Sequence, residues 1–169
     1  MEMQPIVVKS HLNRTIESFR HKKILVIGDL ILDQYIWGDA ERLSPEAPVP
    51  IVWAKRKTHL LGGAANVAHN IVSAGGQAAL CGVVGKDEQG DLLLSMLKEK
   101  DIGTELIVQE EGRPTTLKTR VLAHSQQMLR LDWESQEVLP TTVVQQMFSV
   151  LKEHLANYDG VIIEDYGKG

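Results

Sequence analysis

Two aspartates directly follow the first apolar segment of the chain. Their side chains could bind a polar ligand. The segment Lys23–Gly28 (KILVIG) is typical of a buried strand, and Asp29 and Asp33 come directly after it. Ligands of open α/β sheets collect at the carboxyl ends of the strands. A carboxylate there can accept hydrogen bonds from two adjacent hydroxyl groups, as on a sugar. Either aspartate could instead cap a turn, which is a common role for this residue.

A glycine pair before an alanine-rich segment is the second candidate. Gly62 and Gly63 allow the backbone to approach a ligand closely and leave N–H groups free to bind it. Asn66 follows one helical turn later, and its amide can both donate to and accept from a hydroxyl group. A glycine pair alone also marks an ordinary turn, so the pair by itself does not establish a site.

Alternating strand and helix patterns must position these residues. Apolar periodicity predicts helices over 9–20, 62–74, 92–100 and 141–155, and strands over 23–28, 80–85, 115–123, 127–132 and 160–163. The alternation predicts an α/β fold, with a mainly parallel sheet and flanking helices. Two extended regions, 34–56 and 115–132, interrupt it, and we expect them to form a small separate β lid.

Charge and composition argue against several classes of protein. The 169 residues carry a net charge of −4, which argues against broad electrostatic binding to nucleic acid. Cys81 is the only cysteine, so we expect a small buried side chain rather than a disulfide or a metal ligand. The histidines show no ligand spacing, and no metal site is predicted. The sequence has no leader pattern and no apolar run near the roughly 18 residues of a membrane span. We therefore expect a cytoplasmic protein.

The spacing of small residues resembles the first signature of the ribokinase, or pfkB, carbohydrate kinases. The residues that match are Gly62, Gly63, Ala64, Asn66, Ala68, Gly75 and Gly85. Residues Gly85–Gly90 (GKDEQG) are similar to the turn G-x-D-x-x-G of the same family. A narrower likeness is Arg42–Pro50 (RLSPEAPVP), which resembles a stretch of the heptose-7-phosphate kinases, the kinase half of bifunctional ADP-heptose synthesis proteins. Gln126–Asp132 and Asp165–Gly169 continue the match in the family's order.

The resemblance implies a partial ribokinase-like fold, with a sugar held between an α/β body and a β lid. It implies transfer of the γ-phosphoryl group of ATP to the anomeric hydroxyl of a heptose 7-phosphate, in ADP-heptose and lipopolysaccharide synthesis. The residues implied to hold sugar hydroxyls are Asp33, Gly62, Gly63 and Asn66. ATP and Mg²⁺ are the implied cosubstrate and metal of the intact kinase.

Basic residues on the lid segments are, by the same resemblance, candidates for the phosphate of the substrate. They are Lys118, Arg120 and Arg130, and an arginine offers a bidentate fork to phosphate. These side chains could instead form the charged outer face of a strand, and Arg130 could simply pair with Asp132, two residues away. Lys168 is a possible phosphate contact, since it follows the last predicted strand.

The sequence has no G-A-G-D motif, which holds the catalytic base of the family. We therefore interpret residues 1–169 as a truncated N-terminal portion of a kinase domain. No catalytic residue is assigned, and we expect the chain alone to bind no ATP and to be inactive. We also expect its parallel sheet to end in an exposed apolar edge, because later strands of the family would cover it.

Other functions remain open on the sequence. Within the class, the parent could be another pfkB-type sugar or nucleoside kinase, which a requirement for a phosphorylated sugar would distinguish. Outside it, the chain could be a non-catalytic module that binds a sugar or forms a homodimer through the lid. Candidate contact residues for such a dimer are Tyr35, Ile36, Trp37, Ile51 and Trp53. Their alternative role is packing between the lid and the body.

Overall fold

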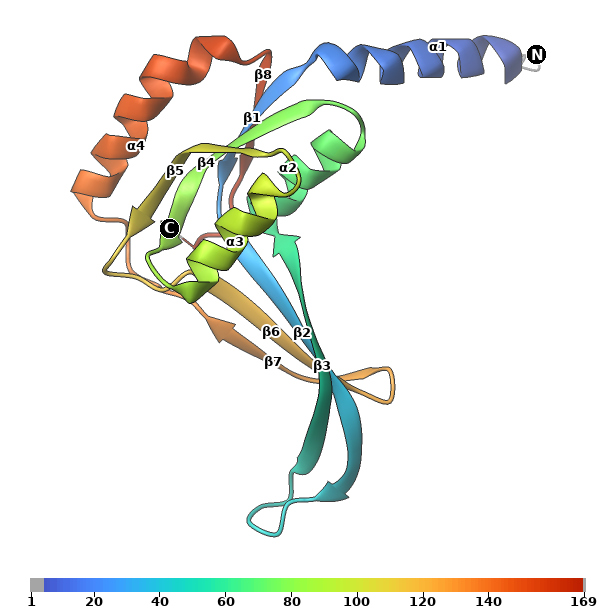
Figure 1. Ribbon diagram of the computed structural model, residues 1–169, viewed down its shortest axis with the longest axis vertical. Coiled ribbons are helices and arrows are strands. Elements are labelled where there is room, and N and C mark those ends of the chain that lie inside the picture. The colour runs from blue at the N-terminus through green and yellow to red at the C-terminus, as the bar shows by residue number, and fades with distance from the viewer. Residues whose placement is uncertain (1–4, 169) are drawn as a thin grey trace.

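The computed structural model describes residues 5–168 and contains two four-stranded sheets with helices around one of them (Figure 1). In chain order the elements are α1 (Pro5–Ser18), η1 (Phe19–His21), β1 (Lys23–Gly28), β2 (Leu30–Leu43), β3 (Pro50–Gly62), α2 (Gly63–Ser73), β4 (Gln77–Gly85), α3 (Glu88–Lys98), β5 (Gly103–Glu110), β6 (Thr116–Ala123), β7 (Gln126–Trp133), α4 (Thr141–His154), η2 (Leu155–Asn157) and β8 (Gly160–Glu164). Gly169, the last residue of the Asp165–Gly169 motif, lies outside the described residues. Between residues 5 and 168, no helix is both long and apolar enough to span a membrane.

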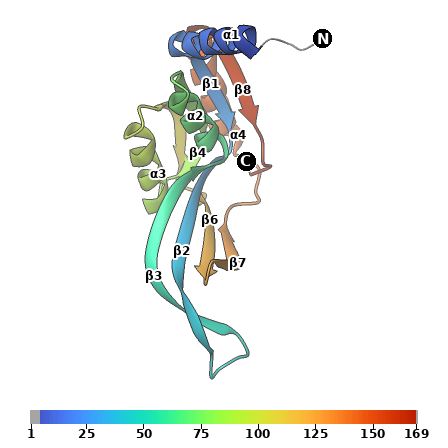
Figure 2. The same ribbon diagram turned by 90° about the vertical axis from the view of Figure 1, so that its right-hand side faces the viewer.

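The first sheet, sheet A, is parallel throughout and has the strand order β5-β4-β1-β8. Helices α2 and α3 cover one face of it, and α4 covers the other (Figures 1 and 2). Leu25 and Cys81 pack toward α4, whereas Val26 and Leu80 pack toward α2 and α3. This arrangement confirms the predicted α/β class with a mainly parallel sheet. Cys81 is fully buried, as expected, and burial raises the pKa of its thiol to about 11.

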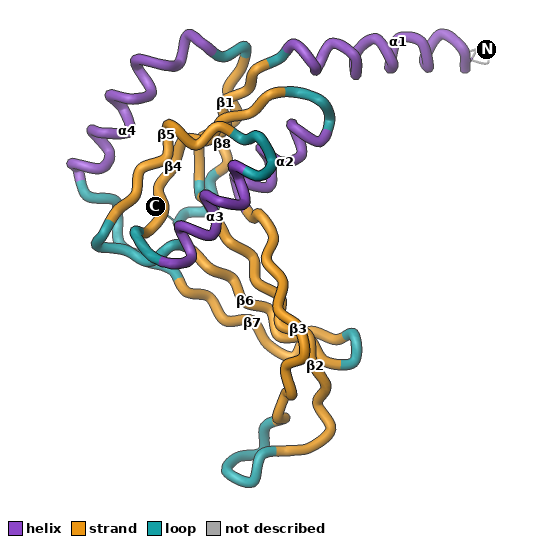
Figure 3. The backbone as a smooth tube through the Cα atoms, viewed as in Figure 1, coloured by secondary structure: helices purple, strands orange, loops and turns teal. Residues whose placement is uncertain are grey.

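The second sheet, sheet B, has the strand order β3-β2-β6-β7. Strands β2 and β3 form a long antiparallel ribbon, β2 and β6 pair in parallel, and β6 returns as β7 through a tight turn. In that turn His124 and Ser125 have φ angles of 50° and 64°. The β2–β3 ribbon reaches well beyond the body, at the opposite end of the molecule from α1 (Figures 2 and 3). The predicted extended regions, 34–56 and 115–132, both fall within sheet B.

The two sheets share one apolar core. Strand β2 begins two residues after β1 ends, and its first residues, Leu30 and Leu32, are almost fully buried. They pack with Leu61 of β3 and Leu117 of β6 against the alanine-rich face of α2 and against α3. Burial of each leucine contributes on the order of 2 kcal/mol. This shared core fixes the base of sheet B on the body.

Several elements differ from the expectation. Helix α1 begins at Pro5 rather than at residue 9, β4 begins at Gln77 rather than at residue 80, and β2 and β3 extend beyond the predicted region 34–56, to Leu30 and Gly62. Strand β5 was not predicted, because Glu105, Gln109 and Glu110 surround its few apolar residues and obscure the strand pattern. Helix α3 begins at Glu88 rather than at residue 92. It starts early because the Asp87 side chain caps it by accepting a hydrogen bond of 2.8 Å from Gly90 N.

Strand β8 forms an exposed apolar edge of sheet A. Val161, Ile162 and Ile163 remain 45%, 38% and 74% exposed, although parallel strands are normally buried on both faces. The structure therefore contains the apolar edge that the sequence led us to expect.

Asp87 connects helix α3 to the loop that leads into sheet B. Besides capping the helix, its carboxylate accepts hydrogen bonds from Thr115 N (2.8 Å) and Thr115 Oγ1 (2.7 Å). Thr115 is 2% exposed and immediately precedes β6. Burial acts to raise the pKa of Asp87, but the hydrogen bonds from Thr115 and Gly90 outweigh it and hold that pKa below its ordinary value. The carboxylate form is thus the one that anchors β6.

We predict that Asp87→Asn lowers the free energy of unfolding by about 1–3 kcal/mol, measured by urea denaturation at pH 7. Asparagine can still cap α3, but its amide nitrogen would face the N–H group of Thr115. Because the folded-state pKa is depressed, the stabilisation by Asp87 is present above the unfolded pKa of about 3.9 and is lost as pH falls below it. The difference between the two proteins should therefore shrink in acid. Asp91→Asn, on the exposed side of α3, is the control. An equal loss of unfolding free energy in both variants would contradict the role of Asp87 in anchoring β6.

Candidate functional site

Asp33 and Arg120 form an ion pair in the middle of sheet B. Asp33 lies on β2 and Arg120 on β6, and the guanidinium Nη1 donates to the Asp33 Oδ1 atom. Their side chains are 20% and 23% exposed, so the pair is largely withdrawn from solvent. The hydrogen bond with Asp33 raises the pKa of Arg120 above its ordinary value. On the other side, the guanidinium lies 5.3 Å from the ring centre of Tyr35, within range of a cation–π contact.

Lys118 and Arg130 share a second carboxylate on the same face. Lys118 Nζ lies 3.6 Å from Asp132 Oδ2, and Arg130 Nε donates to Asp132 Oδ1 at 2.8 Å. Lys118 is 14% exposed, which does not fit a freely solvated outer face, whereas Arg130 is half-exposed. The pairing of Arg130 with Asp132, which the sequence left open as an alternative, is present.

Strand register places all of these groups on one side of sheet B. Asp33 pairs with Lys118 across β2 and β6, and Lys118 and Arg120 pair with Asp132 and Arg130 across β6 and β7. We call this set (Asp33, Lys118, Arg120, Arg130 and Asp132) the charged face. It contains three cations and two carboxylates, and therefore one net positive charge at neutral pH.

The glycine pair lies beside the charged face. A Cβ atom on Gly62 would stand 2.6 Å from Asp33 Oδ2, so only glycine leaves room for the carboxylate there. Gly63 has a φ angle of +53°, and a Cβ atom on it would stand 2.3 Å from the carbonyl oxygen of Asp29. Asn66 is exposed in the first turns of α2. The structure thus brings Asp33 and the glycines together and leaves the Asn66 amide open to solvent close by.

Asp29 has a local structural role rather than a place on the charged face. Its Oδ2 atom accepts hydrogen bonds from Tyr166 N (2.7 Å) and Lys168 N (3.1 Å). Asp29 therefore fixes the loop after β8, which corresponds to the turn-capping role considered for it.

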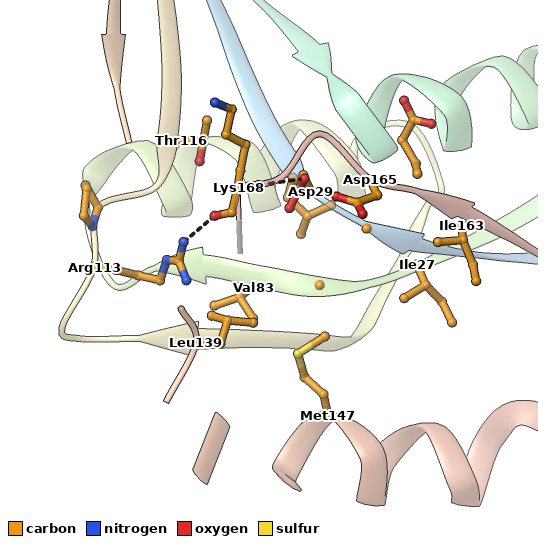
Figure 4. Close-up of a pocket in the computed structure, with 15 residues that line it drawn as sticks. Ile27, Asp29, Val83, Arg113, Thr116, Leu139, Met147, Ile163, Asp165 and Lys168 are labelled. Atoms are coloured by element: carbon orange, nitrogen blue, oxygen red, sulfur yellow. Dashed lines mark hydrogen bonds between the residues drawn. The ribbon is translucent and has the colours of Figure 1, made fainter. Parts of the chain in front are cut away.

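Lys168 and Arg113 lie at a separate pocket of about 220 Å³ where β1, β4 and β8 end (Figure 4). Arg113 donates to the Lys168 carbonyl oxygen at 2.5 Å, and Lys168 Nζ donates to Glu134 Oε1 at 2.7 Å. Lys168 thus joins this pocket to the end of sheet B, since Glu134 follows β7. The second oxygen of Glu134 is buried and has no hydrogen-bond partner among the described residues. Asp29 also lines this pocket, whereas the other predicted site residues do not.

Sequence reasoning missed four residues that lie near the charged face or beside Lys168. Tyr35 had been considered only as a contact residue, and Arg113 and Glu134 had no assigned role. Tyr166 is also close: its hydrogen bond with Glu164 raises the pKa of its hydroxyl, and the negative charge of Asp33 adds to that effect. Alternation along β2 could have identified Tyr35, because it lies two residues from Asp33 and therefore on the same face.

Solved structures of sugar kinases share this fold. A carbohydrate kinase from Agrobacterium tumefaciens matches with a TM-score of 0.67 and 18% identity, over 84% of this chain and 45% of that one. A ribokinase from Cryptococcus neoformans, solved in complex with ADP, matches with a TM-score of 0.54 and 22% identity, over 84% and 40%. The class of fold is therefore ribokinase-like.

The chain belongs to the pfkB family of carbohydrate kinases, because the family model matches residues 21–164. It is 49% identical to the bifunctional protein HldE of Helicobacter pylori, over 88% of this chain and 32% of that protein. It is 46% identical to HldE of Sulfurimonas denitrificans, over 87% and 31%. The chain thus spans about a third of the length of these relatives. The resemblance seen in the sequence is confirmed at the level of the family.

We predict that Gly63→Ala lowers the free energy of unfolding by about 2 kcal/mol or more, measured by urea denaturation. The alanine would need a left-handed backbone conformation and would press its Cβ atom against the backbone at Asp29. Gly112→Ala is the matched control, because Gly112 lies in an exposed loop and its nearest neighbour would be the flexible end of Glu110. If the Gly63 variant were as stable as the wild type, the close approach of Gly63 to the Asp29 carbonyl oxygen would not be needed for the fold.

Proposed function

We propose that this chain is the sugar-binding part of a kinase that phosphorylates the anomeric hydroxyl of a heptose 7-phosphate, for ADP-heptose and lipopolysaccharide synthesis. The observation that carries the proposal is the charged face, which gathers Lys118, Arg120 and Arg130 beside Asp33. The 46–49% identity to bifunctional HldE proteins supports the same assignment. So does the Arg42–Pro50 segment, which resembles heptose-7-phosphate kinases.

The proposed binding divides the sugar between two groups of residues. Asp33 accepts hydrogen bonds from sugar hydroxyls, Asn66 exchanges them, and Gly62 and Gly63 let the sugar approach the backbone. Lys118 and Arg120 bind the phosphate, with Arg130 at the more exposed rim. Sheet B then acts as the lid of the site. A neutral sugar or nucleoside lacks the phosphate these cations would bind, and this separates the proposal from kinases of such substrates.

No residue of this chain is assigned to ATP or Mg²⁺, which the family resemblance implies for the intact kinase. Among residues 5–168, no group of three or more His, Cys, Asp or Glu is placed to hold a metal ion. The sequence also lacks the G-A-G-D motif, whose glycines would bind the transferring phosphate and whose aspartate would be the base. We therefore propose that the isolated chain is inactive as a kinase.

Isothermal titration should show binding of D-glycero-D-manno-heptose 7-phosphate and no binding of ATP. Lys118→Ala is expected to weaken heptose phosphate binding about tenfold or more, because it removes a charged, largely buried hydrogen-bond donor. The control is Lys55→Ala, whose amine lies on the outer part of β3 and pairs with Asp39. No heptose phosphate binding by the folded chain, or ATP-dependent phosphorylation of a sugar by it, would contradict the assignment.

We also propose a homodimer through the outer part of the β2–β3 ribbon. Trp53 is 74% exposed there, and with Ile51 and Val52 it lines a groove of about 710 Å³ between the strands. Leu43 and Val49 extend this apolar surface toward the tip. Tyr35 and Trp37 are not part of it, because they stack on each other and carry Arg120 and Arg56 over their rings.

Sedimentation velocity should detect this dimer in the purified chain. Trp53→Ser is expected to shift it to monomer, because it removes the most exposed aromatic side chain of the groove. Phe148→Ser removes a comparably exposed ring from α4 and should leave the dimer intact. A chain that stays monomeric at high concentration would contradict the proposed dimer.

A further inference from the structure

We propose that Arg120 is a specificity-determining residue that occupies Asp33 until the phosphate of a substrate withdraws it. This inference rests on the proposed function, since it concerns how the same sugar site selects phosphorylated substrates. Phosphate binding and sugar binding would then be coupled, because Oδ1 of Asp33 becomes available to a sugar hydroxyl when an anion takes over the guanidinium of Arg120.

Arg120 already occupies one oxygen of the Asp33 carboxylate in the structure. Arg120 donates to Oδ1, and the Asp33 side chain is only 20% exposed. A hydroxyl that approaches this carboxylate therefore competes with a charged donor, and charge-assisted hydrogen bonds are roughly twice as strong as neutral ones. A neutral sugar supplies nothing to compensate for the loss of that bond.

A phosphate supplies the missing compensation. Arg120 and Arg130 are directly opposite each other across β6 and β7, and like charges in such a position repel. Lys118 lies on the same face, two residues before Arg120 on β6. A dianion bound among these three cations relieves the repulsion and offers Arg120 a stronger partner than a single carboxylate oxygen. The Tyr35 ring beneath the guanidinium provides a surface along which it can move while remaining stacked.

Among the cations of the charged face, only Arg120 is paired with Asp33. Asp132 accepts from Arg130 and lies near Lys118, but no bond joins Asp132 to Asp33. Arg130 can therefore bind phosphate without freeing Asp33. This difference makes Arg130→Gln a matched control for Arg120→Gln, since each removes one cation from the charged face.

The first test follows the Arg120 side chain directly. The ¹⁵N–¹H resonance of its Nε–H group, assigned by its absence in Arg120→Lys, should shift as inorganic phosphate is added to the wild-type chain at constant ionic strength. An unchanged resonance at phosphate concentrations that bind the protein would overturn the exchange.

The second test measures coupling between phosphate and a neutral sugar. Unphosphorylated D-glycero-D-manno-heptose is titrated into the chain with and without inorganic phosphate. For the wild type, phosphate should tighten sugar binding about fivefold or more. Arg120→Gln should bind the neutral sugar tightly without phosphate and show no response to it. Arg130→Gln should bind phosphate more weakly yet keep the coupling.

The outcomes separate this inference from the proposed function. If heptose 7-phosphate binds but phosphate neither moves Arg120 nor tightens neutral sugar binding, the exchange is wrong and the proposed function stands. If heptose 7-phosphate fails to bind while phosphate still moves Arg120 and couples to a neutral sugar, the exchange stands and the heptose assignment is wrong. Weaker neutral sugar binding in Arg120→Gln would mean that Arg120 supports Asp33 rather than occupying it.

Discussion

The alternation of side chains along β2 is the constraint on which the site depends. Leu30 and Leu32 are buried in the core that joins the two sheets, and the next odd-numbered residue, Asp33, must therefore face the opposite side. The same logic applies on β6, where burial of Leu117 turns Lys118 and Arg120 toward Asp33. A shift of one residue in either strand would bury charges and expose leucines. The apolar core thus sets the orientation of every group on the charged face.

The charged face is balanced before any ligand binds. Each of its cations has a carboxylate within reach, and these pairs are partly withdrawn from water. Removing one member would leave its partner poorly solvated, which costs far more than the pair contributes to stability. Ligand binding at such a surface is a change of partners rather than the creation of new charge. The free energy of ligand binding then depends on which of these ion pairs the ligand breaks.

Much of the fold was predictable from local patterns, whereas the contacts of the site were not. Strand β1 was identified by its unbroken apolar run, and helices α2 and α4 by apolar residues at helical spacing. Strand β5 was missed since it has one buried face and charged residues around it. Asp33 and Arg120 lie 87 positions apart, and only the pairing of β2 with β6 brings them together. The role of Asp29 in fixing the loop after β8 was equally unpredictable, because its partners are backbone amides far along the chain.

The central position of β1 has a consequence for how the chain folds during its synthesis. One edge of β1 pairs with β4, but the other pairs with β8, and the contact from Lys23 to Asp159 spans 136 positions. Such distant pairings are slow to form. Sheet B, α2 and α3 all leave the ribosome before β8 does. The centre of sheet A therefore keeps an open apolar edge until β8 has emerged, which makes the nascent chain a natural client for chaperones.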